Sequence, residues 1–452
     1  MRIIIAGDGK VGVTLTRKLS AEGYDLTVID SNPKVLEASL ERYDVMAVHG
    51  NCALMSVLEE AEVEKTDLLI AATSADEINL LCCMTAHQMN PNLHTIARIR
   101  NPEYSEQIYR MRDAFALSMT VNPEKQAAVE IERLLKYPGF LQRDTFAKGK
   151  VEIVELRIDK NSVLKDVSLN ELYSIIKCKV LVCAVRRNGV VEAPDGNFIL
   201  KEGDRIYVTA PRFNMTILLK NLGIITHKVK KIMICGGGRV SYYLARQLEN
   251  TGISVKIIEE NADRARQLAE LLPNVTVICG DASRRTLLES QGIENCDALV
   301  TLTGMDELNI IISLYAKNCG VPQVITKVAH TEKSNIQDTL ELGSIVCPKE
   351  LCCNTIVRYV RALEAQTGAA IAVHSIVDGQ AEALEFRVGE HTKYCGMLLK
   401  DIKVKKNVLI VCITHRGRTV IPNGESKFEL GDTVIVVATG DTVIHQLNDI
   451  FE

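Results

Sequence analysis

The amino-acid sequence predicts an α/β protein with two doubly wound parallel sheets, each followed by a small α+β domain. Over residues 1–30, an apolar strand-like run, a glycine-rich loop, a helix-like stretch and a second apolar run succeed one another. The same order recurs over residues 231–259. After each of these parts the pattern changes to short segments of period two, separated by turns that contain glycine and proline.

The first strand and loop are predicted from the opening residues. Ile3 to Ala6 is an apolar run typical of a strand that is buried on both faces. The pattern Gly-x-Gly-x-x-Gly follows directly. Gly7 permits a tight turn, Gly9 lets the backbone approach a pyrophosphate, and Gly12 lets the helix pack closely on the strand. This is the arrangement of a Rossmann-like nucleotide site, in which the start of the helix faces the anion.

An acidic residue ends the next strand. The helix-like stretch from Lys10 stops at Gly23, and Leu26 to Ile29 reads as a strand that leads into Asp30. Asp30 lies 18 residues beyond Gly12, where a carboxylate accepts from a ribose 2′-hydroxyl. No arginine follows closely to receive a 2′-phosphate, which favours NAD over NADP. The ribose of ATP, ADP or S-adenosylmethionine would suit the same acid.

The opening pattern is duplicated with its spacing intact. Gly7 and Gly23 are 16 residues apart, as are Gly236 and Gly252, which indicates a sequence repeat. Serine replaces the third glycine in the second copy. The corresponding features of that copy are Gly236, Gly238, Ser241, Gly252 and Glu259.

Basic residues and threonines complete the two candidate sites. Lys10 and Arg239 occupy the same place in the two loops, where each could neutralise a phosphate or remain a solvated cation. Thr73 and Thr303 follow apolar strands, and doubly wound sheets bind ligands at such strand ends. The alternative for the threonines is a helix N-cap. A further strand, residues 94–99, carries Arg98, which could reach the same phosphates or lie on the surface.

Four domains are predicted along the chain. Nucleotide-binding domains are expected at residues 1–140 and 230–366, and small α+β domains at 150–222 and 373–452. Each nucleotide-binding part closes with a helix that begins at a proline, over 123–136 and 348–364, and these helices are expected to pair neighbouring domains. The segments 141–150, 223–230 and 366–373 are predicted linkers.

Composition narrows the class of protein. The chain has 452 residues with 57 acidic and 53 basic side chains, a net charge of −4, which gives no support for nucleic-acid binding. Its 14 cysteines show no Cys-x-x-Cys spacing, so we expect no metal site and a reducing, cytoplasmic compartment. The chain opens on a core strand and has no long apolar run, so neither a signal peptide nor a membrane helix is expected.

Catalytic patterns are missing from the sequence. The nine histidines fall singly, and no positioned acid or base can be read beside a nicotinamide. We therefore expect the nucleotide to act as a signal and the protein not to be an enzyme. The alternatives are an NAD-dependent oxidoreductase with unrecognised catalytic residues and a scaffold with vestigial loops.

The duplicated pattern resembles tandem RCK/KTN domains, the regulators of potassium conductance and transport. The resemblance rests on the opening Met-Arg-Ile-Ile-Ile-Ala-Gly-Asp-Gly-Lys-Val-Gly, on Gly280-Asp281-Ala282, and on a repeated Thr-x-x-Asp-Glu-x-Asn. It implies a cytosolic regulatory subunit of a Trk-type potassium uptake system, peripheral on the inner face of the plasma membrane. Such a subunit forms a ring, a homo-oligomer taken to be a tetramer. It gates a membrane-embedded potassium channel or transporter in response to NAD(H), ATP or ADP.

The same resemblance implies the residues that line each site. The first site would contain Gly7, Asp8, Gly9, Lys10, Val11, Asp30, Thr73, Ser74 and Arg98. The second would contain Gly236, Gly237, Gly238, Arg239, Val240, Glu259, Asp281 and Thr303. Two departures stand out: Asn51-Cys52 replaces the Asp281-Ala282 element in the first copy, and Lys327 replaces Arg98 in the second.

Overall fold

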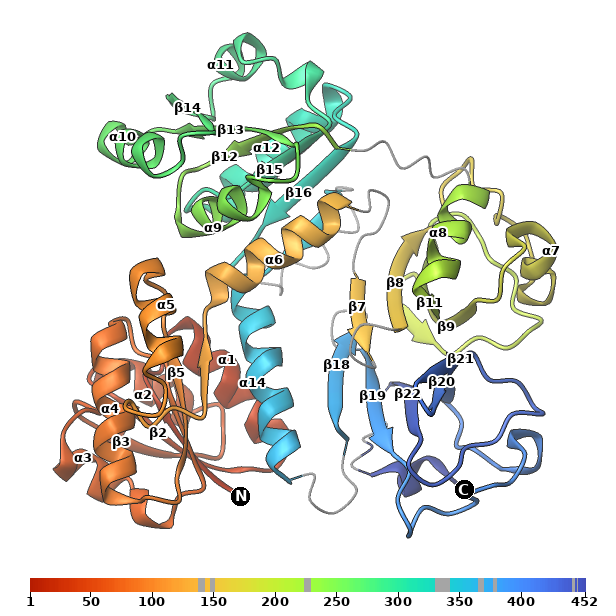
Figure 1. The fold of residues 1–452 in the computed structure, drawn as a ribbon, viewed down its shortest axis with the longest axis horizontal. Coiled ribbons are helices and arrows are strands. Elements are labelled where there is room, and N and C mark those ends of the chain that lie inside the picture. Colours follow the sequence, from red (N-terminus) through yellow and green to blue (C-terminus); the bar gives the residue numbers. More distant parts are fainter. Residues whose placement is uncertain are drawn as a thin grey trace. The chain divides into compact units, whose positions relative to one another are not determined.

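The first sheet is six-stranded and parallel, with strand order β3-β2-β1-β4-β5-β6. The order reverses between β1 and β4, which makes the sheet doubly wound, and sheets of this kind bind ligands at the point of reversal. This confirms the predicted fold class. The strands are β1 (Arg2–Ala6), β2 (Asp25–Asp30), β3 (Met46–His49), β4 (Leu68–Ala71), β5 (His94–Arg98) and β6 (Met119–Val121) (Figure 1).

The computed structural model describes residues 1–136, 143–146, 151–222, 229–329, 342–364, 370–376, 380–440, 444 and 446–452. Two compact units divide the chain: residues 1–127 with 347–359, and residues 128–346 with 360–452. Within the described residues, no helix combines the length and apolar character needed to cross a bilayer.

Helices cover the first sheet and explain its apolar strands. Ile4 and Leu69 of the central strands belong to one buried cluster with Cys82 and Cys83 of α4. Ile3 is also at most 1% exposed, so β1 is buried on both faces, as its sequence predicts. The helices are α1 (Lys10–Ala21), α2 (Pro33–Leu40), α3 (Met55–Glu60), α4 (Asp76–Met89), α5 (Pro102–Arg110) and α6 (Pro123–Lys136).

The second sheet repeats this topology, with strand order β14-β13-β12-β15-β16-β17. All its neighbouring strands are parallel. Its strands are β12 (Lys231–Cys235), β13 (Ser254–Glu259), β14 (Thr276–Cys279), β15 (Ala298–Thr301), β16 (Gln323–Lys327) and β17 (Ser344–Val346). Its helices are α9 (Arg239–Leu248), α10 (Ala262–Leu271), α11 (Arg285–Ser290), α12 (Asp306–Asn318) and α14 (Pro348–Glu364).

Two five-stranded antiparallel sheets follow the parallel ones, in the orders β10-β9-β11-β8-β7 and β18-β19-β22-β20-β21. The first contains β7 (Arg143–Phe146), β8 (Val151–Arg157), β9 (Leu181–Arg187), β10 (Val190–Glu192) and β11 (Arg205–Pro211), with helices α7 (Leu172–Ile176) and α8 (Arg212–Asn221). The second contains β18 (Ala372–Ile376), β19 (Ala381–Arg387), β20 (Val408–His415), β21 (Arg418–Val420) and β22 (Thr433–Thr439).

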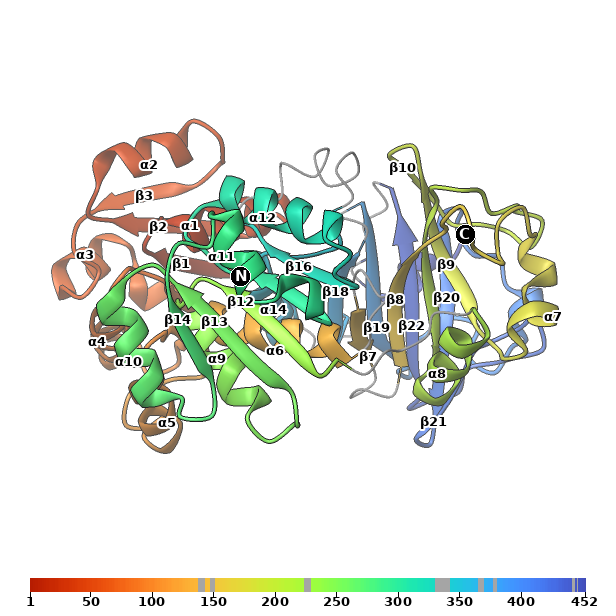
Figure 2. The ribbon, with the colours of Figure 1, turned by 90° about the horizontal axis from the view of Figure 1, so that it is seen from above.

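The antiparallel sheets are buried on both faces, although the period-two segments seen in the sequence are typical of half-buried strands. Val154 and Leu156 of β8 point into the core of their own domain. Ile153 points the other way and joins a cluster with Ala383 of β19 and Val437 of β22. The two sheets therefore pack on each other, and Figure 2 shows them side by side. A period-two pattern shows which residues of a strand share a face, but it does not show what packs against the second face.

Several short strands lie where no strand was predicted. β6 and β17 have three residues each, too few for a periodic signal. β7 lies inside the predicted linker 141–150, and β18 overlaps the predicted linker 366–373, so both linker predictions are wrong there. Each is an edge strand that pairs with its neighbour. Residues 223–228 of the predicted linker 223–230 lie outside the described residues.

The long helices α6 and α14 have the bounds predicted from sequence. α14 follows the second parallel sheet in the chain, yet its first part packs on α1 of the first. Lys18 Nζ lies 3.0 Å from Glu350 Oε2 and donates to Asn354 Oδ1 at 2.8 Å. In the other unit, Gln323 of β16 donates from Nε2 to the carbonyl oxygen of Leu134 in α6 at 2.8 Å. The two helices are thus exchanged between the copies.

A buried ion pair anchors the first antiparallel sheet. Asp204, 1% exposed, accepts from Arg187 Nε at 2.8 Å and Nη2 at 2.7 Å, and from the amide of Lys201 at 2.7 Å. We expect Asp204→Ala to lower the free energy of unfolding by about 3 kcal/mol, because it leaves a partly buried guanidinium unpaired. Chemical denaturation measures the change. Glu202→Ala, which removes the exposed pair with Lys165, should cost much less; equal losses would contradict this assignment.

Candidate functional site

The loop after β1 closes tightly against neighbouring backbone. Gly7 has φ +98°, and a β-carbon on it would lie 2.7 Å from the amide nitrogen of Thr73. Its own amide donates to the carbonyl of Ile29 at 2.7 Å. A β-carbon on Gly12 would overlap the carbonyl oxygen of Gly7. This geometry fits the roles predicted for both glycines, since the turn and the helix approach leave no room for a side chain.

The start of α1 opens onto free space. A β-carbon on Gly9 would meet no atom within 4 Å. Gly9 is the N-cap of α1, and no side chain caps the helix amides there. Lys10 is exposed beside this end, whereas Val11 is buried and anchors the helix to the sheet. Unpaired amides and the helix dipole make this position suitable for a phosphate group.

Asp30 is held in place by backbone amides. Its Oδ2 accepts from the amide of Asp8 at 2.7 Å, and its Oδ1 accepts from the amide of Asn32 at 2.8 Å. Each carboxylate oxygen has a second lone pair free to accept from a ribose hydroxyl. Asp8 itself is buried, and its Oδ2 accepts from Ser39 Oγ at 2.5 Å.

Thr73, at the end of β4, is braced by an asparagine of the next helix. Asn79 Oδ1 accepts from Thr73 N at 2.8 Å and from Thr73 Oγ1 at 2.7 Å. Asn79 Nδ2 donates to the carbonyl of Arg98 at 2.8 Å. The N-cap of α4 is Ala75, so the alternative that Thr73 caps the helix is wrong. Asn79, fully buried, ties the ends of β4 and β5 together at the crevice.

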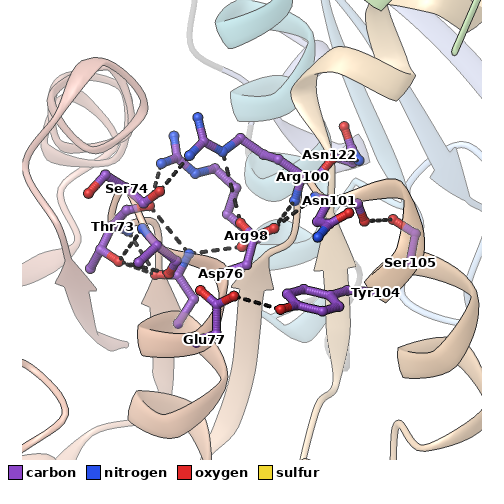
Figure 3. Close-up of polar contacts among 12 residues, drawn as sticks. Thr73, Ser74, Asp76, Glu77, Arg98, Arg100, Asn101, Tyr104, Ser105 and Asn122 are labelled. Carbon is purple, nitrogen blue, oxygen red and sulfur yellow. Dashed lines mark hydrogen bonds and ion pairs between the residues drawn. The ribbon is translucent and has the colours of Figure 1, made fainter. Parts of the chain in front are cut away.

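Two arginines from the end of β5 point at the loop after β4 (Figure 3). Arg98 Nη2 donates to the carbonyl of Thr73, and Arg100 Nη2 donates to the carbonyl of Ser74. Burial, followed by the charge of Arg100, lowers the pKa of Arg98 below its ordinary value. Two guanidinium groups held together against carbonyl oxygens present positive charge to the crevice, where phosphate groups of a nucleotide would be favourable partners.

An acidic side chain supports the arginine strand end. Asp76 Oδ2 accepts from the amides of Arg100 and Asn101 at 2.8 and 2.7 Å. Glu77 accepts from the hydroxyl of Tyr104 at 2.8 Å, which fixes α5 to the start of α4 (Figure 3). Asp76 and Glu77, at the start of α4, therefore position the segment after β5.

The second loop has the same build. Gly236 has φ +103°, and a β-carbon on it would lie 2.9 Å from the amide of Thr303. Glu259 Oε2 accepts from the amide of Gly237 at 2.6 Å, as Asp30 does from Asp8. A β-carbon on Gly238 would meet no atom within 4 Å. Beside this helix start Arg239 is exposed and Val240 is buried.

Ser241 takes the place of the third glycine and is accommodated in the first turn of α9. Its hydroxyl donates to the carbonyl of Gly236, and the residue is fully buried. The serine therefore donates to the carbonyl of Gly236, and the equivalent carbonyl in the first copy, that of Gly7, faces Gly12. Arg264 adds a contact absent from the first loop, since its Nε donates to the carbonyl of Gly237 at 2.8 Å.

The segment after the third strand forms the same turn in both copies. Asp281 Oδ1 accepts from the amide of Ser283 at 2.8 Å, and Asn51 Oδ1 accepts from the amide of Ala53 at 3.0 Å. Hydrogen bonds to Ser283 lower the pKa of Asp281. Cys52 is buried, as is Ala282. The Asn-Cys departure thus preserves the backbone and removes a negative charge from the first site.

A lysine lies at the far end of the second site. Lys327 Nζ donates to the carbonyl of Thr303 at 2.6 Å, at the place of Arg98. Asn309 repeats the role of Asn79: its Oδ1 accepts from Thr303 N at 2.9 Å and its Nδ2 donates to the carbonyl of Lys327 at 3.0 Å. Ala329 occupies the position of Arg100.

The candidate residues therefore lie at the carboxyl ends of parallel strands, namely the first, second, fourth and fifth strands in the first copy and the first four strands in the second copy. Sequence reasoning did not select Asn79, Asn309 or Arg100 as site residues. The asparagines recur six residues after Thr73 and Thr303, and that recurrence is the signal that could have identified them. Arg100 has no counterpart in the second copy, so no repeat indicated it.

Comparison with known families gives two domain types along the chain. The TrkA-N domain matches residues 3–121 and 232–348. The TrkA-C domain matches residues 153–221 and 383–451. Each type thus occurs twice, in alternation, as the parallel and antiparallel sheets do.

Full-length relatives and solved structures agree with this alternating arrangement of two domain types. The chain is 31% identical over 452 residues to a Trk system potassium uptake protein TrkA homolog of Archaeoglobus fulgidus, covering all of both chains. It is 30% identical to the Trk system potassium uptake protein TrkA of Vibrio alginolyticus, covering 100% of this chain and 99% of that one. The GsuK RCK domain superposes with a TM-score of 0.62 at 17% identity, over 97% of this chain and 92% of that one. A GsuK channel bound to NAD superposes with a TM-score of 0.61 at 17% identity, over 97% of this chain and 76% of that one.

Proposed function

Because the chain belongs to the TrkA family, we propose that it is the nucleotide-binding regulatory subunit of a Trk-type potassium uptake system. One observation carries the proposal. Each parallel sheet presents a glycine loop, a helix start without a side-chain cap, and a strand-end carboxylate bonded to a loop amide. This combination suits an adenine nucleotide at the switch point of a doubly wound sheet.

The proposed ligands are NAD(H), with ATP or ADP as alternative or additional effectors. Asp30 and Glu259 would accept from the ribose, and the starts of α1 and α9 would face the phosphates. Arg98 and Lys327, from the far strand ends, would add positive charge. A GsuK channel that shares this fold was solved with NAD bound, which is a precedent for such a ligand on this scaffold.

The nucleotide acts as a signal in this proposal and is not consumed. Arg98 donates to the carbonyl of Thr73, Arg100 donates to the carbonyl of Ser74, and the Thr73 hydroxyl donates to Asn79. These fixed hydrogen bonds suit binding more than proton transfer. The rival function, an NAD-dependent oxidoreductase, predicts steady conversion of NADH by the chain. Unchanged NADH after prolonged incubation with the chain is the result that we expect.

The proposed mechanism is a shift between two shapes of the assembly. A nucleotide would draw the start of α1 towards the strand ends at Thr73 and Arg98, and its differential affinity for the two shapes sets the shift. α1 is tied to α14 by Lys18 and Glu350. The residues of α14 divide between the two compact units, so this helix is suited to carry the movement from the nucleotide site to the rest of the chain.

Each of the four predicted domains has a proposed function. Residues 1–140 and 230–366 would bind nucleotide, and residues 150–222 and 373–452 would follow them as RCK C-terminal domains. The chain would lie in the cytoplasm, on the inner face of the plasma membrane, where it docks on a membrane-embedded potassium channel or transporter subunit.

We propose that copies of the chain assemble into a ring through an apolar groove on the first parallel-sheet domain. The groove has a volume of about 330 Å³, and α4 and the segment 104–115 line it. Leu81 is 49% exposed, Met84 40% and Met111 49%, which is costly for a face in contact with water. Ile311, at the position of Leu81 in the second copy, is 63% exposed.

Charging this groove should dissociate the assembly. For Leu81→Glu/Met84→Glu we expect a smaller particle by light scattering than for the parent, because two carboxylates would be desolvated at the contact. Leu40→Glu, an equally exposed leucine on α2, serves as the control and should leave the particle size unchanged. A double variant of the parent's size would contradict assembly through this face.

Potassium uptake by cells that lack the chain's gene tests the function itself. The parent chain should restore growth at limiting potassium, and a chain with Gly9→Val/Gly238→Val should lose nucleotide regulation of uptake. These positions have open space around an added side chain, so the domains should still fold. If the double variant regulates uptake as the parent does, the proposed function of the two loops is wrong.

A further inference from the structure

Asp8 is a buried carboxylic acid inside the first glycine loop. It lies between Gly7 and Gly9, is 1% exposed, and accepts from Ser39 Oγ of α2 through Oδ2. Its other oxygen, Oδ1, is buried and has no hydrogen-bond partner among the described residues. Oδ1 lies 3.6 Å from the position of a β-carbon on Gly12, under the first turn of α1. A carboxylate in this position costs free energy unless it is protonated or paired.

The groups that face Asp8 do not neutralise it. β2 contributes the Asp30 carboxylate, α2 contributes the Ser39 hydroxyl, and α1 contributes backbone. The nearest cations along α1 and α2, Lys10 and Lys34, are exposed. Burial raises the pKa of Asp8 to about 6, the negative charge of Asp30 also raises it, and the bond from Ser39 opposes them.

The second copy shows that the loop forms without this carboxylate. Gly237 replaces Asp8, and Leu268 occupies the position of Ser39. A β-carbon on Gly237 would lie 2.6 Å from Leu268 Cδ1 and 2.8 Å from Glu259 Oε2, so the leucine fills the space. A polar pair in one copy thus corresponds to a small and apolar pair in the other. The loop therefore folds without an acid at this position. We infer that the carboxyl group of Asp8 has a role that is specific to the first site.

We propose that Asp8 couples proton uptake to nucleotide binding at the first site, so that acidification tightens binding there and leaves the second site unaffected. The inference rests on the proposed function, because it needs a nucleotide whose phosphates lie at the start of α1. Those phosphates add negative charge beside a carboxylate that already faces Asp30. Binding therefore favours the protonated acid, whose hydrogen can be carried by Oδ1.

The sign follows from linkage. The pKa of Asp8 is about 6 in the free chain and higher in the complex, so the complex binds more protons wherever the pH lies between the two values. Affinity then rises as the pH falls through that window and levels off below it. If binding raises the pKa from about 6 to about 7, affinity at pH 6 is roughly fivefold that at pH 8.

The test uses the full chain and NADH, whose diphosphate does not titrate between pH 6 and pH 8. Gly238→Val leaves the first site as the reporter, and Gly9→Val leaves the second. We expect NADH to bind the first-site chain several-fold more tightly at pH 6 than at pH 8, with proton uptake in calorimetry in two buffers. The second-site chain should show no such change.

Asp8→Asn in the first-site chain keeps the size of the side chain and an acceptor for Ser39, and should make binding independent of pH. Asp8→Gly/Ser39→Leu, which installs the pair of the second copy, should do the same. A pH dependence that persists in Asp8→Asn would overturn the inference, as would pH-independent binding in the first-site chain. Absence of NADH binding at every pH would instead overturn the proposed function, and the inference with it.

Discussion

Asn79→Leu is expected to abolish nucleotide binding at the first site and to lower the free energy of unfolding by about 3 kcal/mol. The side chain is fully buried, and leucine has the same branched arrangement of four heavy atoms, so the substitution leaves no cavity and the loss comes from polar groups. The amide and hydroxyl of Thr73 and the carbonyl of Arg98 would each lose their bond to it. The ends of β4 and β5 would then separate at the edge of the crevice.

Denaturation and NADH titration of the same preparation measure both effects of Asn79→Leu. Asn309→Leu is the matched variant, because Asn309 makes the same bonds to Thr303 and Lys327. It should affect the second site and spare the first. Asn92→Leu, an exposed asparagine, controls for the substitution itself and should change neither measurement. Full nucleotide affinity in Asn79→Leu would show that the asparagine bonds do not shape the site.

Gly12→Ser is the second large effect that we expect. A β-carbon on Gly12 would overlap the carbonyl oxygen of Gly7, so α1 must move away from the loop. Overpacking of this kind costs about 2 kcal/mol, and the displaced helix start no longer faces the phosphates. We therefore predict loss of first-site binding together with a lower melting temperature.

The second copy supplies the control for Gly12→Ser. Ser241 already occupies the equivalent position and donates to the carbonyl of Gly236. Ser241→Gly should cost only about 1 kcal/mol, from the lost hydrogen bond, and leave second-site binding intact. If Gly12→Ser were as mild as Ser241→Gly, the close approach of α1 to its loop would not be a requirement of the first site.

Local features of the chain were predictable because local physics determines them. The turn at Gly7, the strand before it and the carboxylate of Asp30 follow from residues within one short segment. The helices 123–136 and 348–364 were predicted with their observed bounds, since a proline starts each and an apolar stripe continues it. Comparison of the two copies then identified the threonines at the strand ends.

Contacts between distant segments were not predictable from one sequence. That the start of α14 packs on α1, through Lys18 and Glu350, depends on tertiary structure and not on either helix alone. The burial of β8 on both faces depends on a second sheet, and β7 is stabilised as a strand by its pairing with β8. The environment of Asp8 likewise depends on Ser39, which lies 31 residues away.

The most direct test of the central claim is equilibrium binding of NADH to the parent chain and to Gly9→Val. Gly389→Val is the matched control, because a β-carbon there also meets no atom within 4 Å and the residue lies outside both loops. The account predicts saturable binding to the parent and to Gly389→Val, recovery of the NADH unchanged, and loss of first-site binding in Gly9→Val with an unaltered melting temperature. Binding to Gly9→Val at the parent's affinity and stoichiometry, or consumption of the NADH, would contradict it.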